Sequence, residues 1–87
     1  MLEYHPHAER QLEERRISKA EAEKVLNKPR EILDTDIPTR KIAQKIIIKA
    51  GKKFLYRVIY MIKNGNKLII TIYRTTKIKK YLRGDKK

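Results

Sequence analysis

Apolar residues in the second half of the chain recur with the period of two that is typical of β-strands. The pattern predicts three strands, at residues 39–50, 54–62 and 68–75. Gly51 separates the first two and Asn64-Gly65 the last two, and residues of these types accept the positive φ angles of tight hairpin turns. The three strands are therefore expected to form an antiparallel meander with residues 54–62, which are apolar on both faces, in its centre.

The first third of the chain has the three-to-four-residue spacing of amphipathic helices instead. Pro6 is placed to open the first helix, since proline suits the first helical turn. Ser18 and Glu21 form a capping-box pattern that starts the second helix, and Pro29 ends it because the residue before proline disfavours helical geometry. Two shorter elements complete the pattern, an edge strand at residues 30–34 and a helix at residues 78–82.

Together these elements predict a single α+β domain over residues 1–87. We expect two N-terminal helices packed on one face of a mainly antiparallel four-stranded sheet, with a short C-terminal helix. Each N-terminal helix is too short to be stable alone, so both need the apolar face of the sheet. The other face of the sheet is therefore expected to be open.

Arg57 decides which face is covered, because an unpaired arginine beneath the helices would cost free energy. Side chains alternate along a strand, so Tyr56 and Val58 are expected in the core. The same alternation places Ile42 and Ile70 there too. The open face would then carry Lys41, Lys45, Arg57, Thr71 and Tyr73, with Leu55, Ile59, Met61 and Ile69 among them. A basic, partly apolar surface of this kind usually marks an interaction site.

The charge is distributed unevenly along a chain whose net charge is +13. Residues 1–36 carry seven basic and nine acidic side chains, whereas residues 37–87 carry sixteen basic side chains and one acidic one. No acidic side chain occurs between residues 37 and 84. Folded surfaces normally mix both signs, so we expect a polyanionic partner, and RNA in particular. The alternative is a lysine-rich surface without such a partner.

Arg57 is the strongest candidate for a functional residue, because it interrupts an apolar strand and arginine can bind a phosphate through two parallel hydrogen bonds. Alternatively, its stem packs on the sheet and its head is solvated. Tyr73 and Arg74 are candidates at the end of the last strand. His7 could transfer protons, or it could be a packing or capping residue in the first helical turn.

A second set of residues is expected to bind nucleic acid. Lysines neutralise phosphates and bases stack on tyrosine rings. The set consists of Lys41, Lys45, Lys77, Lys79, Lys80 and Tyr81. For Tyr81 the alternative is an apolar anchor that holds the last helix.

Several classes of protein are disfavoured by what the sequence lacks. There is no cysteine, which excludes disulfides and thiolate metal sites. There is no phosphate-binding glycine-rich loop, and the sheet residues hold no paired carboxylates for Mg²⁺. We therefore expect neither a metal nor a cofactor. The first residues lack an apolar segment of signal-peptide length and no window approaches a membrane span, so a cytoplasmic protein with no membrane partner is expected.

Four segments, HAERQLEERRIS, AEKVLNKP, YRVIY and ITIYRTTKIKKY, lie within residues 7–81. Together they resemble a family of small domains related to the RelE/ParE and BrnT-type toxins of toxin–antitoxin systems. The resemblance implies a RelE-like fold and an endoribonuclease of the mRNA-interferase type, which cleaves RNA without a metal, often within the ribosome. It also implies an acidic antitoxin protein as a partner.

Carried over by position, the resemblance points to His7, Arg10, Arg57 and Tyr73, with Arg74 nearby. The expected catalytic set is therefore Arg57, Tyr73, Arg74 and His7. ParE-type relatives inhibit gyrase instead of cleaving RNA, so a shared fold does not fix the target. A toxin that acts by binding a protein, and a non-catalytic RNA- or DNA-binding module, stay open as alternatives.

Overall fold

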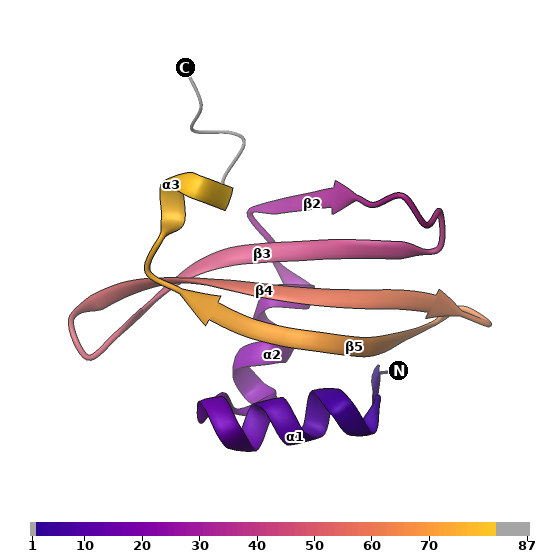
Figure 1. Ribbon diagram of the computed structural model, residues 1–87, viewed down its shortest axis with the longest axis horizontal. Helices are drawn as coiled ribbons and strands as arrows, with labels where there is room; N and C mark the ends of the chain where they lie inside the picture. The colour runs from indigo at the N-terminus through magenta and orange to yellow at the C-terminus, as the bar shows by residue number, and fades with distance from the viewer. Residues whose placement is uncertain (1, 82–87) are drawn as a thin grey trace.

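A five-stranded sheet forms the centre of the structure, a computed structural model in which residues 2–81 are described. The strands lie in the order β1-β5-β4-β3-β2 (Figure 1). In chain order the elements are β1 (Leu2–Tyr4), α1 (Pro6–Arg15), α2 (Lys19–Asn27), β2 (Glu31–Asp34), β3 (Arg40–Lys49), β4 (Lys52–Lys63), β5 (Asn66–Thr75) and α3 (Ile78–Tyr81). The fold is thus of the α+β class, as the sequence predicts.

The antiparallel meander of β3, β4 and β5 is confirmed. Both hairpins close with two-residue turns in which both residues have positive φ, 54° and 76° at Ala50 and Gly51, and 53° and 80° at Asn64 and Gly65. This geometry matches the twist of antiparallel strands and favours glycine and asparagine. The edge strand β2 pairs antiparallel to β3 within the expected segment.

The sheet has one strand more than the sequence analysis expects, so the prediction of four strands is wrong. β1 pairs parallel to β5, from Leu2 opposite Lys67 to Tyr4 opposite Ile69. The pairing continues into the backbone bond that His5 donates to Ile69, at 2.9 Å. Three residues are too few for an alternating pattern to register, which is why the strand escapes sequence reasoning.

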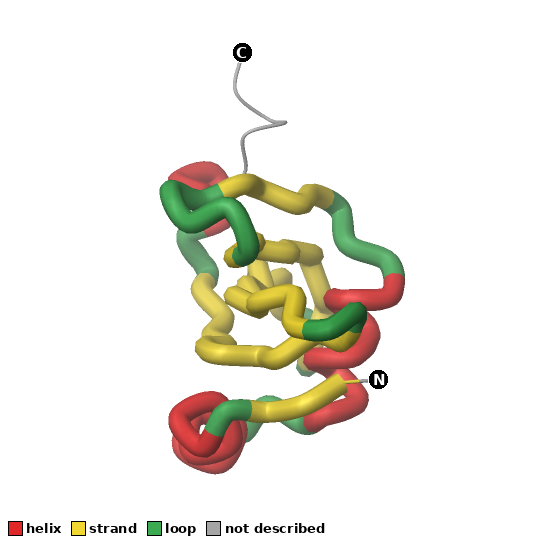
Figure 2. The backbone as a smooth tube through the Cα atoms, turned by 90° about the vertical axis from the view of Figure 1, so that its right-hand side faces the viewer, coloured by secondary structure: helices red, strands yellow, loops and turns green. Residues whose placement is uncertain are grey.

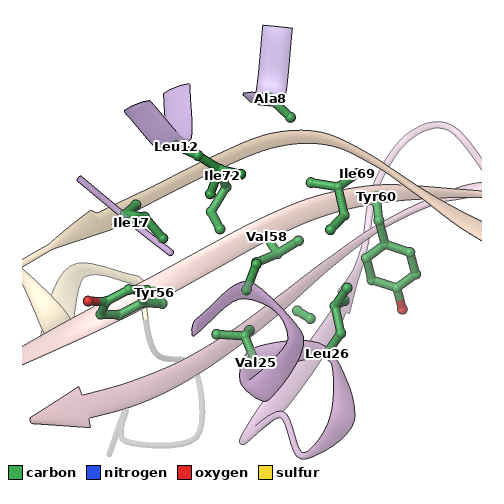
Figure 3. Packing of buried hydrophobic residues seen from close by; sticks show 12 residues of the cluster. Ala8, Leu12, Ile17, Val25, Leu26, Tyr56, Val58, Tyr60, Ile69 and Ile72 are labelled. Carbon is green, nitrogen blue, oxygen red and sulfur yellow. The ribbon is translucent and has the colours of Figure 1, made fainter. Parts of the chain in front are cut away.

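The two N-terminal helices begin where the sequence predicts. Pro6 occupies the first turn of α1, and α2 has a complete capping box between Ser18 and Glu21. α1 packs along β5 and α2 packs on β3 and β4, and side chains of both helices join one core cluster, so both cover the same face of the sheet. Figure 2 shows the sheet and the helices as a backbone tube. Figure 3 shows the core between these layers, formed by Ala8, Leu12, Ile17, Val25, Leu26, Tyr56, Val58, Tyr60, Ile69 and Ile72 among others. Within residues 2–81, no helix is long and apolar enough to cross a membrane.

A β-bulge changes the side-chain alternation in β5. Ile59 pairs with Thr71 whereas Tyr60 pairs with Ile69, so Ile70 is an extra residue in the ladder. As a result Ile69 is fully buried in the helix-covered core together with Ile72. The expectation that Ile69 lies on the open face and Ile70 in the core is therefore wrong, because a bulge reverses the alternation on one side of it.

Strand β3 faces the other way from the expected orientation. Ala43 is the buried residue that contacts the helix-covered core, directly opposite Val58. Its neighbours Lys41 and Lys45 therefore lie on the helix side, and Ile42 and Ile46 lie on the other face. A small side chain lets a helix approach the sheet closely, and this outweighs the apolar area of the isoleucines. The open face is consequently apolar around Arg57, and the predicted basic open face is wrong.

The C-terminal helix α3 is confirmed at residues 78–81, while Leu82, also expected in it, lies outside the described residues. Gln44 in β3 donates a hydrogen bond to the carbonyl oxygen of Tyr81, at 3.1 Å. Gln44 alternates with Ala43 and so points away from α2. α3 therefore lies on the face opposite α1 and α2, where it covers part of the surface that was expected to be open (Figure 1).

Candidate active site and nucleic-acid interface

Four polar side chains lie side by side across the face of the sheet that carries α3. Glu31, Gln44, Arg57 and Tyr73 occupy directly opposite positions on β2, β3, β4 and β5. Three hydrogen bonds link them in this order. Gln44 Nε2 donates to Glu31 Oε1 at 2.6 Å, Arg57 Nε donates to Gln44 Oε1 at 2.8 Å, and Arg57 Nη1 donates to the Tyr73 hydroxyl at 2.5 Å. These four residues are called the polar row below.

The polar row is set into an otherwise apolar surface. On the same face, Ile42 and Ile46 flank Gln44, and Leu55 and Ile59 flank Arg57. Gln44 is fully buried and Arg57 is only 9% exposed. Buried polar groups are tolerated where hydrogen bonds satisfy them, so the row holds the guanidinium in one fixed orientation.

α3 packs against the polar row. The ring centroid of Tyr81 lies 4.3 Å from the Arg57 guanidinium carbon, and that of Tyr73 lies 5.7 Å from it. Both rings can interact with the cation through their π faces. Across residues 2–81, no carboxylate forms an ion pair with Arg57. Among the described residues, the direct partners of the Arg57 guanidinium are therefore neutral acceptors and aromatic rings.

This arrangement offers two chemical functions. A guanidinium with a fixed orientation and no bound carboxylate can donate charge-assisted hydrogen bonds to a phosphate oxygen. The Tyr73 hydroxyl, which accepts from the guanidinium, keeps its own proton available for donation. The candidate site thus combines an anion-binding cation with a neighbouring proton donor.

Two members of the expected catalytic set lie elsewhere. Arg74 is on the helix side, where its Nη1 donates to the Tyr56 hydroxyl at 3.1 Å and its guanidinium stacks over the Phe54 ring at 5.0 Å. His7 is exposed in the first turn of α1, and its backbone N–H donates to Nδ1 of His5 at 3.0 Å. Only Arg57 and Tyr73 come together, and His5, not His7, caps the helix.

The candidate nucleic-acid-binding residues divide into two groups. Lys41 and Lys45 lie on the helix side, bound to the Asp34 carboxylate at 2.6 Å and to the Lys28 carbonyl oxygen at 2.9 Å respectively. Their expected place beside Arg57 is wrong for the reason given for β3. Lys77, Lys79 and Lys80 are exposed in and just before α3, which lies on the polar row. Tyr81 covers Arg57 directly.

Sequence reasoning missed Gln44 and Glu31, which orient Arg57. On its face of β3, Gln44 lies between Ile42 and Ile46 in the same way as Arg57 lies between Leu55 and Ile59 in β4. Two such interruptions in neighbouring strands are a signal for a buried polar pair. Reading it requires the register between the strands, which places the two residues directly opposite each other.

A second polar cluster lies on the helix side around Glu21. Its carboxylate accepts hydrogen bonds from the Ser18 backbone at 3.0 Å and from the Tyr56 hydroxyl at 3.1 Å, and it forms an ion pair with Lys49 at 3.1 Å. Burial alone would raise the pKa of Glu21, but these hydrogen bonds and the charge of Lys49 outweigh it and hold the pKa below its ordinary value of 4.5. The cluster ties α2 to β3 and β4 and is a structural feature.

Replacing Glu21 with glutamine is expected to make stability less dependent on pH. A depressed folded-state pKa stabilises the protein above the ordinary value of 4.5, and this contribution is lost as the pH falls through the folded-state pKa. Glutamine can keep the capping-box bond. Urea unfolding of wild type and Glu21→Gln should therefore give a large difference at about pH 7 and a small one at about pH 3. An equal difference at both pH values would contradict this role for Glu21.

Comparison with known proteins gives the family of the chain. A family described as "Domain of unknown function (DUF4258)" matches residues 4–74, so the chain belongs to it. The matched segment contains all four residues of the polar row and ends before α3. No curated protein and no solved structure matches the chain. In the described part of the chain, no group of three or more His, Asp or Glu side chains is arranged to hold a metal ion.

Proposed function

We propose that this chain is an RNA-directed, toxin-like endoribonuclease that works without a metal ion, with Arg57 and Tyr73 as its catalytic residues. The observation that carries the proposal is Arg57, a residue only 9% exposed, whose guanidinium has no carboxylate partner within residues 2–81 and is hydrogen-bonded to a tyrosine hydroxyl. The absence of acidic side chains from residue 37 to residue 84 supports a polyanionic substrate. The resemblance of the chain to RelE-type toxins agrees with this reaction class.

The reaction that fits these groups is transesterification within RNA. The ribose 2′-oxygen attacks the adjacent phosphorus, the bond from phosphorus to the 5′-oxygen breaks, and a 2′,3′-cyclic phosphate forms. Arg57 neutralises the negative charge that grows on the phosphate oxygens. The Tyr73 hydroxyl gives a proton to the departing 5′-oxygen, and water takes the proton of the 2′-hydroxyl and reprotonates the tyrosine. No metal or cofactor is required for this step.

A non-catalytic RNA-binding module is the second candidate. It is favoured by the position of Tyr81 above Arg57 and by the distance in the fold between Arg57 and the other expected catalytic residues, His7 and Arg74. In that case Lys77, Lys79 and Lys80 would carry the binding through phosphate contacts. Incubation of the purified protein with single-stranded RNA in excess EDTA separates the two candidates, because fragments form only if the chain is catalytic.

RNA binding itself should depend steeply on salt. Each neutralised phosphate of a single strand contributes about −0.7 to the slope of log affinity against log salt concentration. Removing the charges of Lys79 and Lys80 by substitution with glutamine should therefore reduce the magnitude of the slope by about 1.4. The matched control replaces Lys19 and Lys24 on α2, which should leave the slope unchanged. Fluorescence anisotropy at several salt concentrations measures both, and equal effects of the two double substitutions would refute binding beside α3.

We further propose an acidic protein partner of the antitoxin type, which would bind the apolar surface around the polar row. Ile59 and Met61 are half-buried on that surface, and Arg40 and Lys63 lie at its rim. An acidic amphipathic segment would cover the apolar area and neutralise the charge. Leu55, expected to be exposed there, is fully buried.

The substitution Ile59→Asp is expected to abolish this complex, since a carboxylate would replace an apolar contact at its centre. Ile62→Asp is the matched control, because Ile62 alternates to the other face and is 46% exposed. Co-purification from the native host with a protein encoded nearby gives the readout. A complex that survives Ile59→Asp but not Ile62→Asp would place the partner on the other face.

A further inference from the structure

Within residues 2–81, the polar and aromatic contacts between α3 and the sheet involve Tyr81. The helix has four residues, and helices of that length have almost no stability of their own. Two interactions join it to the polar row, the hydrogen bond from Gln44 to the Tyr81 carbonyl oxygen at 3.1 Å and the Tyr81 ring over Arg57 at 4.3 Å. Both act through Tyr81. The hydrogen bond ends on a main-chain oxygen and survives substitution, so truncating Tyr81 removes the ring contact and weakens the hold of the sheet on the helix.

The electrostatic environment of Arg57 favours a better partner than Tyr81. A guanidinium at 9% exposure has lost most of its hydration, and within residues 2–81 it has gained no carboxylate in return. An aromatic ring compensates a buried cation only weakly, whereas a phosphate does so through charge-assisted hydrogen bonds. Arg57 Nε and one Nη1 hydrogen are used by Gln44 and Tyr73, so within residues 2–81 the Nη2 group has no hydrogen-bond partner and can donate to a ligand.

We propose that α3 is a lid on a phosphate-binding site at Arg57, and that Tyr81 occupies the place of a nucleobase in the closed state. When the lid opens, a phosphate oxygen binds the free edge of the guanidinium and a base can stack where the tyrosine ring lay. The identity of the natural ligand as RNA rests on the proposed function. The lid and the phosphate site rest on the geometry around Arg57 alone.

A lid of this kind lowers the apparent affinity of the site for its ligand. The apparent dissociation constant equals the intrinsic constant divided by the fraction of open molecules. A ring–guanidinium contact corresponds to a factor of roughly 2 to 30 in an equilibrium constant. Removing the ring of Tyr81 should therefore raise the affinity for phosphate by up to about 30-fold, provided that the closed form predominates in the wild type.

The test uses the full chain with inorganic phosphate as the probe. Phosphate is titrated while the NMR signal of the Arg57 Nε–H group is followed, in the wild type and in Tyr81→Ala. Tyr81→Leu keeps an apolar side chain and loses the π face, so it serves as a second variant if alanine unfolds the protein. Tyr81→Phe keeps the ring and is the matched control. The lid predicts affinity roughly 2- to 30-fold higher in Tyr81→Ala and Tyr81→Leu and unchanged in Tyr81→Phe. It also predicts no saturable phosphate binding in Arg57→Gln, measured by calorimetry.

An affinity that stays equal or falls in folded Tyr81→Ala and Tyr81→Leu would overturn the lid. A parallel titration with a single-stranded oligoribonucleotide separates this failure from failure of the proposed function. If phosphate binding rises in the variants but no variant binds RNA, the lid stands and the RNA-directed function falls. If phosphate affinity does not rise in the folded Tyr81 variants but RNA still binds, the RNA-directed function stands and the lid falls.

Discussion

Replacing Ile69 with alanine is expected to destabilise the protein by about 2–5 kcal/mol, whereas Ile70→Ala is expected to cost less than about 1.5 kcal/mol. Ile69 is fully buried in the core beneath the helices, and Ile70 is partly exposed at the bulge. Truncating a buried isoleucine loses its transfer free energy and leaves a cavity, and neither cost is complete at a partly exposed position.

Thermal unfolding of the two variants measures both stability losses directly. In a domain of this size, 1 kcal/mol corresponds to roughly 4–8 °C in Tm, so Ile69→Ala should lower Tm by at least about 8 °C. The two substitutions remove the same atoms from neighbouring positions in one strand, which makes each the control for the other. Equal losses, or a larger loss for Ile70→Ala, would mean that β5 follows a simple alternation without the bulge.

The bulge also explains which parts of the fold could be predicted from the sequence. Strand ends and hairpins are set by local turn chemistry, and the positive φ values at Gly51 and Gly65 are visible in the sequence as Ala-Gly and Asn-Gly pairs. The capping box at Ser18 is equally local. The bulge at Ile70 depends on how β5 pairs with β4, so no local pattern reveals it.

The orientation predicted for strand β3 was wrong for a related reason. Its isoleucines and lysines alternate cleanly, and the apolar side was assigned to the helix-covered core. The structure instead packs Ala43 beneath α2, and Ile42 and Ile46 form a second apolar surface on the other face. Alternation gives two sets of side chains, but which set faces the helices depends on the space that the helices leave. Because β3 faces the other way from the prediction, Lys41 and Lys45 lie on the helix side and not at the candidate site.

The prediction that Arg57 and Tyr73 share a face of the sheet is confirmed. The pairing also depends on the bulge, because a register counted from the Asn64-Gly65 turn without it would put Arg57 opposite Ile72, and the extra residue Ile70 brings Tyr73 opposite Arg57 instead. Arg74 is one residue further along and therefore points to the opposite face, where it contacts Tyr56. A resemblance of short motifs could not separate these neighbouring residues, whereas the sheet geometry does.

Replacing Arg57 with alanine is expected to reduce RNA cleavage by about 100-fold or more, because it removes the group that neutralises transition-state charge. Arg74→Ala is the matched comparison. It removes the same side chain from the other face of the sheet and should leave cleavage within a few-fold of wild type, on the order of ordinary surface substitutions. Cleavage rates are compared at a temperature where unfolding curves prove both variants folded.

The outcome of this comparison has a definite meaning for the site. A large loss in Arg57→Ala with little change in Arg74→Ala agrees with the polar row as the site. A large loss in folded Arg74→Ala together with full activity of folded Arg57→Ala would move the site to the helix side, near Tyr56. Tyr73→Phe tests the proton-transfer function of Tyr73, since it removes the hydroxyl and keeps the ring that contacts Arg57.

The most direct test of the central claim is the chemistry of the RNA ends. End-labelled single-stranded RNA is incubated with the purified wild-type chain in excess EDTA, beside the Arg57→Ala variant prepared in the same way. The account predicts fragments that carry 2′,3′-cyclic phosphate and 5′-hydroxyl ends with the wild type, and at most about one hundredth of that rate with the variant. RNA that is bound but stays intact, or fragments that appear equally with both proteins, would contradict an endoribonuclease built on Arg57.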